Sequence, residues 1–179
     1  DFCLSRGLGD VYKRQLHIRL TERHPFHEET HGQDPGREEI WQALQQLDLN
    51  AYRQIVFGGG GEPMYRLEDM LWLCGKIREK SPVDLRLDTT GLGDLLRGEK
   101  TAFQLEQYFQ VVAIYLPVEE QDVTEEQRKA IRHFAVAAGL FVPKVYLVVP
   151  QSSTKEKKKA CQQLCLQTGA RYREEDWAS

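Results

Sequence analysis

The sequence lacks long apolar runs, a strong net charge and a dense cysteine pattern, and each absence excludes a class of protein. No apolar stretch approaches the roughly 18 residues of a membrane helix, so we expect no membrane partner. The 24 basic and 27 acidic residues leave a net charge of −3, which gives no electrostatic reason to expect nucleic acid as a partner. The four cysteines form no disulfide scaffold, and this usage predicts a reducing, cytoplasmic location.

The remaining composition is that of a one-domain globular protein. The chain has 179 residues, of which 41% are hydrophobic and 28% charged, so it is long enough to bury a core. Residues 1–15 are an exception, because they show neither helical periodicity nor strand alternation. They resemble a translated cloning-adapter scar, and we expect them to lie outside the fold. On that interpretation the natural protein has further sequence upstream, and this chain is truncated at its N-terminus.

From residue 16 onward, strand and helix patterns alternate. The patterns predict strands over residues 54–57, 83–87, 111–116, 145–149 and 170–173, and helices over 37–47, 67–80 and 124–139. A Ser153–Glu156 capping box predicts one more helix, and residues 102–108 are weakly helical. Such alternation predicts an α/β fold with parallel strands, either an open doubly wound sheet or part of a β/α barrel. In both, ligands bind at the carboxyl ends of the strands.

Two polar clusters follow neighbouring strands at those ends. The first, Gly58 to Pro63, contains four successive glycines, which indicate close approach of another group or a positive φ. It lacks the lysine and hydroxyl of a phosphate-binding loop, and Glu62 favours a cation such as an ammonium group. The second, Asp88 to Gly91, offers a carboxylate and two hydroxyls. Plain turns would use the same residue types, so that alternative stays open.

Together these clusters resemble the radical S-adenosylmethionine (radical SAM) enzymes, most closely a subfamily whose genes neighbour TatD-type nucleases. The resemblance implies a partial, TIM-like β/α barrel over residues 16–179 that is N-terminally truncated. It also implies cofactor contacts with the methionine and ribose parts of S-adenosylmethionine from Gly60, Gly61, Glu62 and Pro63 and from Asp88, Thr89, Thr90 and Gly91. Weaker candidates for the ribose and adenine are Tyr115 and residues 149–151. An intact relative would cleave the cofactor reductively at a [4Fe-4S] cluster, and the 5′-deoxyadenosyl radical would abstract hydrogen from an unknown substrate, with a partner supplying the electron.

The chain departs from the family in one respect. The family's cysteine triplet, C-x3-C-x2-C, is absent, and iron–sulfur clusters need thiolate ligands. Cys3 lies in the suspected scar, and the other three cysteines lie on apolar helix faces. Either the cluster loop was lost with upstream sequence, or the chain is a non-catalytic relative that binds a ligand without a cluster. In both cases we expect this chain to be inactive as it stands.

A rival motif is His27-Glu28-Glu29-Thr30-His31, which matches H-E-x-x-H. In zinc hydrolases this spacing places two imidazoles on one helix face, with the glutamate as general base. Here the motif stands between Pro25 and several helix breakers and has almost no apolar stripe. We therefore rank a zinc hydrolase below the other two hypotheses.

Overall fold

The computed structural model describes residues 4–6, 14–27, 32–117 and 123–176. The chain divides into two compact units. The first comprises residues 1–88 and 107–110, and the second comprises residues 89–106 and 111–179. Each unit is an α/β arrangement in its own right.

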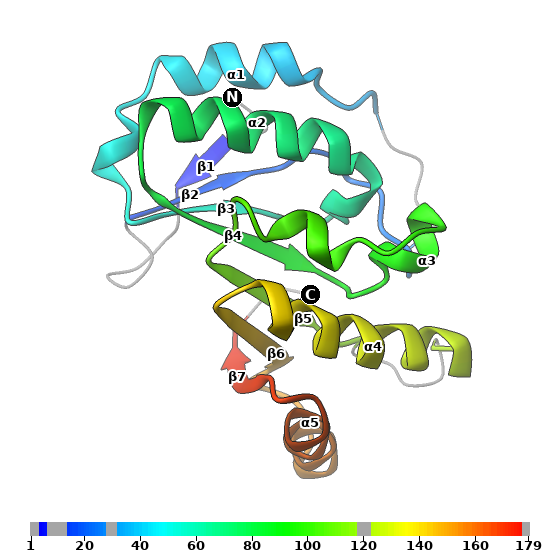
Figure 1. Ribbon diagram of the computed structural model, residues 1–179. Coiled ribbons are helices and arrows are strands. Elements are labelled where there is room, and N and C mark those ends of the chain that lie inside the picture. The colour runs from blue at the N-terminus through cyan, green and yellow to red at the C-terminus, as the bar shows by residue number, and fades with distance from the viewer. Residues whose placement is uncertain (1–3, 7–13, 28–31, 118–122, 177–179) are drawn as a thin grey trace. The chain divides into compact units, whose positions relative to one another are not determined.

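In the first unit, three parallel strands follow one another in chain order (Figure 1). The strands are β2 (Gln15–Ile18), β3 (Gln54–Phe57) and β4 (Asp84–Thr89), and β1 (Leu4–Arg6) runs antiparallel to β2. The helices between them are α1 (Arg37–Gln45), η1 (Leu49–Ala51), η2 (Pro63–Arg66) and α2 (Leu67–Lys80). Figure 1 shows α1 and α2 on the same side of these strands.

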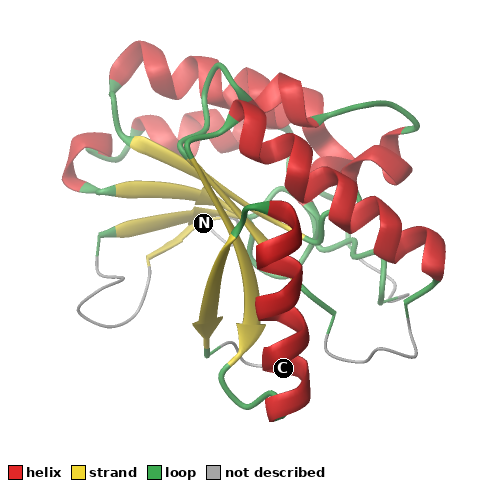
Figure 2. Ribbon diagram, turned by 60° about the horizontal axis from the view of Figure 1, so that its bottom comes forward, coloured by secondary structure: helices red, strands yellow, loops and turns green. Residues whose placement is uncertain are grey.

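The second unit repeats the pattern with three further parallel strands. The strands are β5 (Val111–Tyr115), β6 (Lys144–Pro150) and β7 (Arg171–Glu175). The helices are α3 (Gly93–Arg97), η3 (Ala102–Leu105), α4 (Glu125–Phe141) and α5 (Lys155–Thr168). Figure 2 shows α5 beside the last two strands. With six parallel strands alternating with helices, the predicted α/β class is confirmed.

The apolar periodicities identify the cores correctly. In the first unit, Leu16, Ile18, Ile55, Phe57, Leu85 and Leu87 are buried on one face of the strands, and Ile40, Leu44, Met70, Cys74 and Ile77 are buried on the helices. Alternation along each strand places the remaining side chains on the opposite face, which is largely polar. Thus the sheet of this unit has one apolar and one polar face.

Several predicted boundaries are confirmed, and others need correction. The helix at Leu67–Lys80 and the Thr124–Gln127 capping box are as predicted. The first helix ends at Gln45, because the amides of Gln46 and Leu47 donate to carbonyls three residues back.

Two later predictions were wrong. The helix expected to stop at Gly139 continues to Phe141, since the amide of Val142 still donates to Ala138 four residues earlier. The N-cap of α5 is Thr154, not Ser153. Ser153 belongs to the turn that leaves β6 and donates its amide to Pro150, whereas the Thr154 hydroxyl accepts from the amide of Lys157.

The strand β2 was not predicted as a separate element, although it provides the first parallel strand of the unit. Leu4–Arg6, within the suspected scar, lies beside it as β1. An unpaired sheet edge accepts any extended segment, because its amides and carbonyls need partners. The origin of residues 1–15 therefore stays a prediction. Among the described helices, none combines the length and apolar character needed to span a bilayer.

Candidate functional site

The glycine turn begins directly at the carboxyl end of β3. Gly59 and Gly60 have φ values of +100° and +109°, and both are exposed. Side chains strongly disfavour this backbone region, and nothing within 4 Å would touch a Cβ placed on Gly60. Conformation, not crowding, therefore requires glycine at these two positions. The turn leaves an open stretch of main chain at the strand end.

Gly61 and Glu62 have a different function, because they face the segment that follows β2. A Cβ on Gly61 would overlap the carbonyl oxygen of Thr21, and the Glu62 amide donates to the Arg23 carbonyl at 2.7 Å. The Glu62 side chain is fully buried, and its Oε2 accepts from the Met64 amide at 3.1 Å. Glu62 thus caps η2, the short helix that starts at Pro63.

The glycine turn meets the second polar cluster through Asp88. Phe57 pairs with Leu87 in the parallel register of β3 and β4. A Cβ on Gly58 would lie 2.8 Å from Cβ and 3.3 Å from Oδ2 of Asp88. The sequence reasoning required the two strand ends to lie close together, and Gly58 and Asp88 do so. That Glu62 and Asp88 converge on one ligand stays a prediction. Only glycine at position 58 leaves room for the aspartate.

An ion pair on the polar face of β4 holds Asp88. Nε of Arg86 lies 2.6 Å from Oδ1 of Asp88, and the two side chains are only 5% and 15% exposed. Further along this face, Gln15 Nε2 donates to Gln54 Oε1 at 2.7 Å. The charge-assisted bond between the largely buried side chains of Arg86 and Asp88 fixes the position of both. Sequence reasoning missed Arg86, although a charged residue alternating with Leu85 and Leu87 was the available signal.

In the second unit, Thr89, Thr90 and Gly91 shape the turn after β4. The Thr89 hydroxyl accepts from the Gly91 amide at 3.1 Å, and the Thr90 hydroxyl accepts from the Leu92 amide at 3.4 Å. Gly91 has a φ of +87°, and a Cβ there would lie 3.2 Å from Ile114. Both threonines are buried. Their hydroxyl oxygens accept within the turn, as the plain-turn alternative expects.

The second unit also has a polar strand face. The Tyr115 hydroxyl donates to Oε2 of Glu175 at 2.5 Å, and Nε of Arg173 lies 3.0 Å from Oε1 of the same carboxylate. The Arg173 guanidinium lies 5.4 Å from the Tyr146 ring centroid. Glu175 is 9% exposed, so its charge is held by these neighbours. Sequence reasoning found Tyr115 but not Glu175, which lies at the last strand's end with no motif around it.

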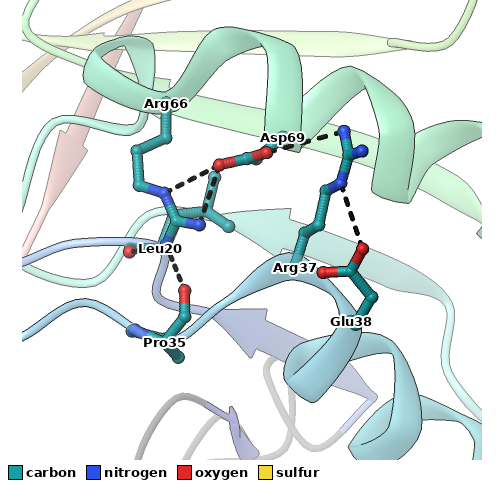
Figure 3. A network of polar contacts seen from close by, with 6 residues as sticks. All are labelled: Leu20, Pro35, Arg37, Glu38, Arg66 and Asp69. Carbon is teal, nitrogen blue, oxygen red and sulfur yellow. Dashed lines mark hydrogen bonds and ion pairs between the residues drawn. The ribbon is translucent and has the colours of Figure 1, made fainter.

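Arg66 fixes the two ends of the loop between β2 and α1. Its Nη1 donates to the Leu20 carbonyl at 2.7 Å and to the Pro35 carbonyl at 2.5 Å, and Asp69 accepts from Nη2 at 2.8 Å (Figure 3). Asp69 also faces Arg37 at 3.7 Å. The arginine comes from the helix that follows the glycine turn, so the turn and the loop are positioned together.

Within this loop, two histidines lie against each other. The ring centroids of His24 and His27 are 4.5 Å apart, and Nδ1 of His24 accepts from the Phe26 amide at 3.2 Å. Burial and the neighbouring His27 lower the pKa of His24 to about 4. Of the predicted zinc motif, Glu28 and His31 lie outside the described residues. Within the described ranges, no group of three or more metal-ligating side chains occurs.

The described cysteines lie in helices and not at strand ends. Cys74 is on α2, while Cys161 and Cys165 are on α5, and all three are buried. Burial raises the pKa of all three thiols, that of Cys161 to about 12. Buried thiols of this kind stay protonated and fill core space. Cys3 lies outside the described residues.

No protein-family model matches the chain, and no curated protein matches its sequence. The fold class and the meeting of the two strand ends therefore stand on the structure alone.

Proposed function

We propose that this chain is a radical-SAM-like domain that binds S-adenosylmethionine at the carboxyl ends of β3 and β4. The observation that carries the proposal is the approach of Asp88 to Gly58. It places an exposed main-chain turn beside a carboxylate. The turn suits close approach of a ligand, and the carboxylate suits a cation. A partial β/α barrel over residues 16–179 is part of the same proposal.

The methionine end of the ligand is a zwitterion with an ammonium and a carboxylate, and a sulfonium lies nearby. The Asp88 carboxylate suits the positive groups, and the Arg86 guanidinium suits the carboxylate. Gly59 and Gly60 leave the ligand room to lie on the main chain. In this proposal Glu62 is a positioning residue, because its Oε2 holds the exit of the turn by capping η2.

The described residues do not fit a [4Fe-4S] cluster. Such a cluster requires cysteine thiolates, and Cys74, Cys161 and Cys165 are buried with raised pKa values. The loop after the first parallel strand, residues 19–36, has three histidines and no cysteine. We therefore favour the relative that binds the cofactor without a cluster over one whose cluster loop was removed.

Calorimetry of the full chain with S-adenosylmethionine tests this proposal. The informative variant is Asp88→Asn, because the amide oxygen can still accept from Arg86 and the buried guanidinium keeps a partner. Loss of a charged contact to the ligand should weaken binding by about tenfold or more. Asp84→Asn, an exposed position on the same face of β4, is the matched control and should leave affinity unchanged.

Three outcomes would overturn the proposal. The first is the absence of binding heat at millimolar ligand while circular dichroism shows the wild-type chain folded. The second is equal affinity of Asp88→Asn, Asp84→Asn and wild type. The third is loss of binding in both variants with unchanged melting temperatures, which would contradict the placement of the ligand at Asp88.

A further inference from the structure

Two cysteines of α5 are in contact with each other in the second unit. Cys161 and Cys165 are four positions apart in the helix, a spacing that places side chains next to each other on one face. Their thiols form a hydrogen bond with each other, and the two residues are only 2% and 8% exposed. The helix therefore holds two sulfur atoms side by side in a sheltered place.

A cavity of about 380 Å³ adjoins this pair. Cys161 forms part of its wall, together with the apolar side chains of Ile131, Val149 and Leu164. On its other side, the Cys161 thiol lies 3.9 Å from the carbonyl oxygen of Leu147, and a thiol is a weak donor. Replacing the thiol proton by a metal ion therefore breaks no strong hydrogen bond at Cys161.

The two thiols suit only some metal ions. Thiolate sulfur is the ligand that soft metal ions prefer. A structural zinc ion needs four ligands, and no group of three or more metal-ligating side chains occurs in the described ranges. Ions such as Cu(I) and Hg(II) accept just two sulfur ligands, one on each side. Two neighbouring thiols therefore match this class of ion and not zinc.

We propose that Cys161 and Cys165 bind a soft metal ion in two-coordinate form. Each sulfur forms one bond to the ion and releases its proton to water, and no electron is transferred. With Hg(II) the two thiolates balance the charge of the ion, so the complex is neutral and suits apolar surroundings. The proposal does not depend on the S-adenosylmethionine site.

Titration with mercuric chloride, with free cysteine as competitor, tests the proposal on the full chain. The parent protein is Cys3→Ser, because Cys3 lies outside the described residues and would bind the ion too. We expect one ion per chain and two sulfur neighbours by X-ray absorption spectroscopy. Cys161→Ala and Cys165→Ala should each weaken binding by at least about a hundredfold, since loss of even an outer partner of a metal ligand costs about 10- to 100-fold.

The matched control is Cys74→Ala, which removes a buried thiol from α2. It should leave affinity within about twofold of the parent protein. Circular dichroism melts check that each variant is folded, and the sulfur count of the parent protein decides the question if an alanine variant unfolds. A count other than two would overturn the proposal. So would unchanged affinity in either α5 variant, or an equal loss in Cys74→Ala.

Discussion

Replacing Gly61 by alanine tests the docking of the glycine turn against the segment after β2. The added Cβ would overlap the Thr21 carbonyl oxygen, and it would lie 2.7 Å from the Thr21 carbonyl carbon and 3.0 Å from the Arg23 carbonyl oxygen. All three are backbone atoms, so a side-chain rotation cannot relieve the overlap. One of the two segments must move.

The expected cost has two parts. Forcing an extra methyl group into a packed site costs about 1 to 3 kcal/mol. The movement also lengthens the 2.7 Å hydrogen bond from the Glu62 amide to Arg23, whose loss contributes about 1 kcal/mol. Gly61→Ala should therefore lower the free energy of unfolding by about 2 to 4 kcal/mol. For a chain of this length, the middle of that range corresponds to a decrease in Tm of about 9 °C.

Urea denaturation followed by circular dichroism measures the effect. Gly139→Ala is the matched control, since nothing lies within 4 Å of a Cβ there and the residue lies inside α4. Alanine should stabilise that helix by about 0.5 to 1 kcal/mol. A Gly61→Ala protein within 1 kcal/mol of wild type would refute the packing argument.

Three further predictions concern pH, thiols and the loop. In the folded chain His24 has a pKa of about 4, whereas in the unfolded chain it protonates near pH 6.5. The free energy of unfolding should therefore fall by about 1 to 2 kcal/mol as the pH drops from 6.5 to 4. Urea melts at pH 7 and 4.5 should show this loss in wild type and a smaller loss in His24→Phe. Iodoacetamide at pH 8 should leave Cys74, Cys161 and Cys165 unmodified in the folded chain, because they are buried, and should modify them in denaturant. Mass spectrometry measures the labelling, and rapid labelling of the folded chain would contradict their burial. Arg66→Met should speed amide exchange in residues 21–27, because the carbonyls at Leu20 and Pro35 lose their donor; unchanged exchange would mean that the arginine does not hold the loop.

Much of the fold follows from local patterns. The apolar residues of α2 recur with helical spacing, and the buried run Val111–Tyr115 forms the strand that its composition predicts. The strand β2 was not predicted, because it is only four residues long and adjoins a segment without periodicity. Its signal was the alternation of Leu16, Ile18 and Leu20, all of which are buried.

The candidate site was predictable only in part. The approach of Gly58 to Asp88 was expected, because strands that are successive in the chain are usually neighbours in the sheet, and β3 and β4 are paired. The burial of Glu62 could not be predicted from the sequence, because it depends on Thr21 and Arg23, some forty positions earlier in the chain. Contacts of that kind depend on tertiary packing, and no spacing in the sequence encodes them.

A crystal structure with Se-adenosylselenomethionine tests the central claim most directly, because selenium gives an anomalous signal that locates the ligand. We expect a single strong peak beside Gly59, Gly60 and Asp88, formed without iron in the crystal. A peak at any other place, or none at saturating ligand, would contradict it.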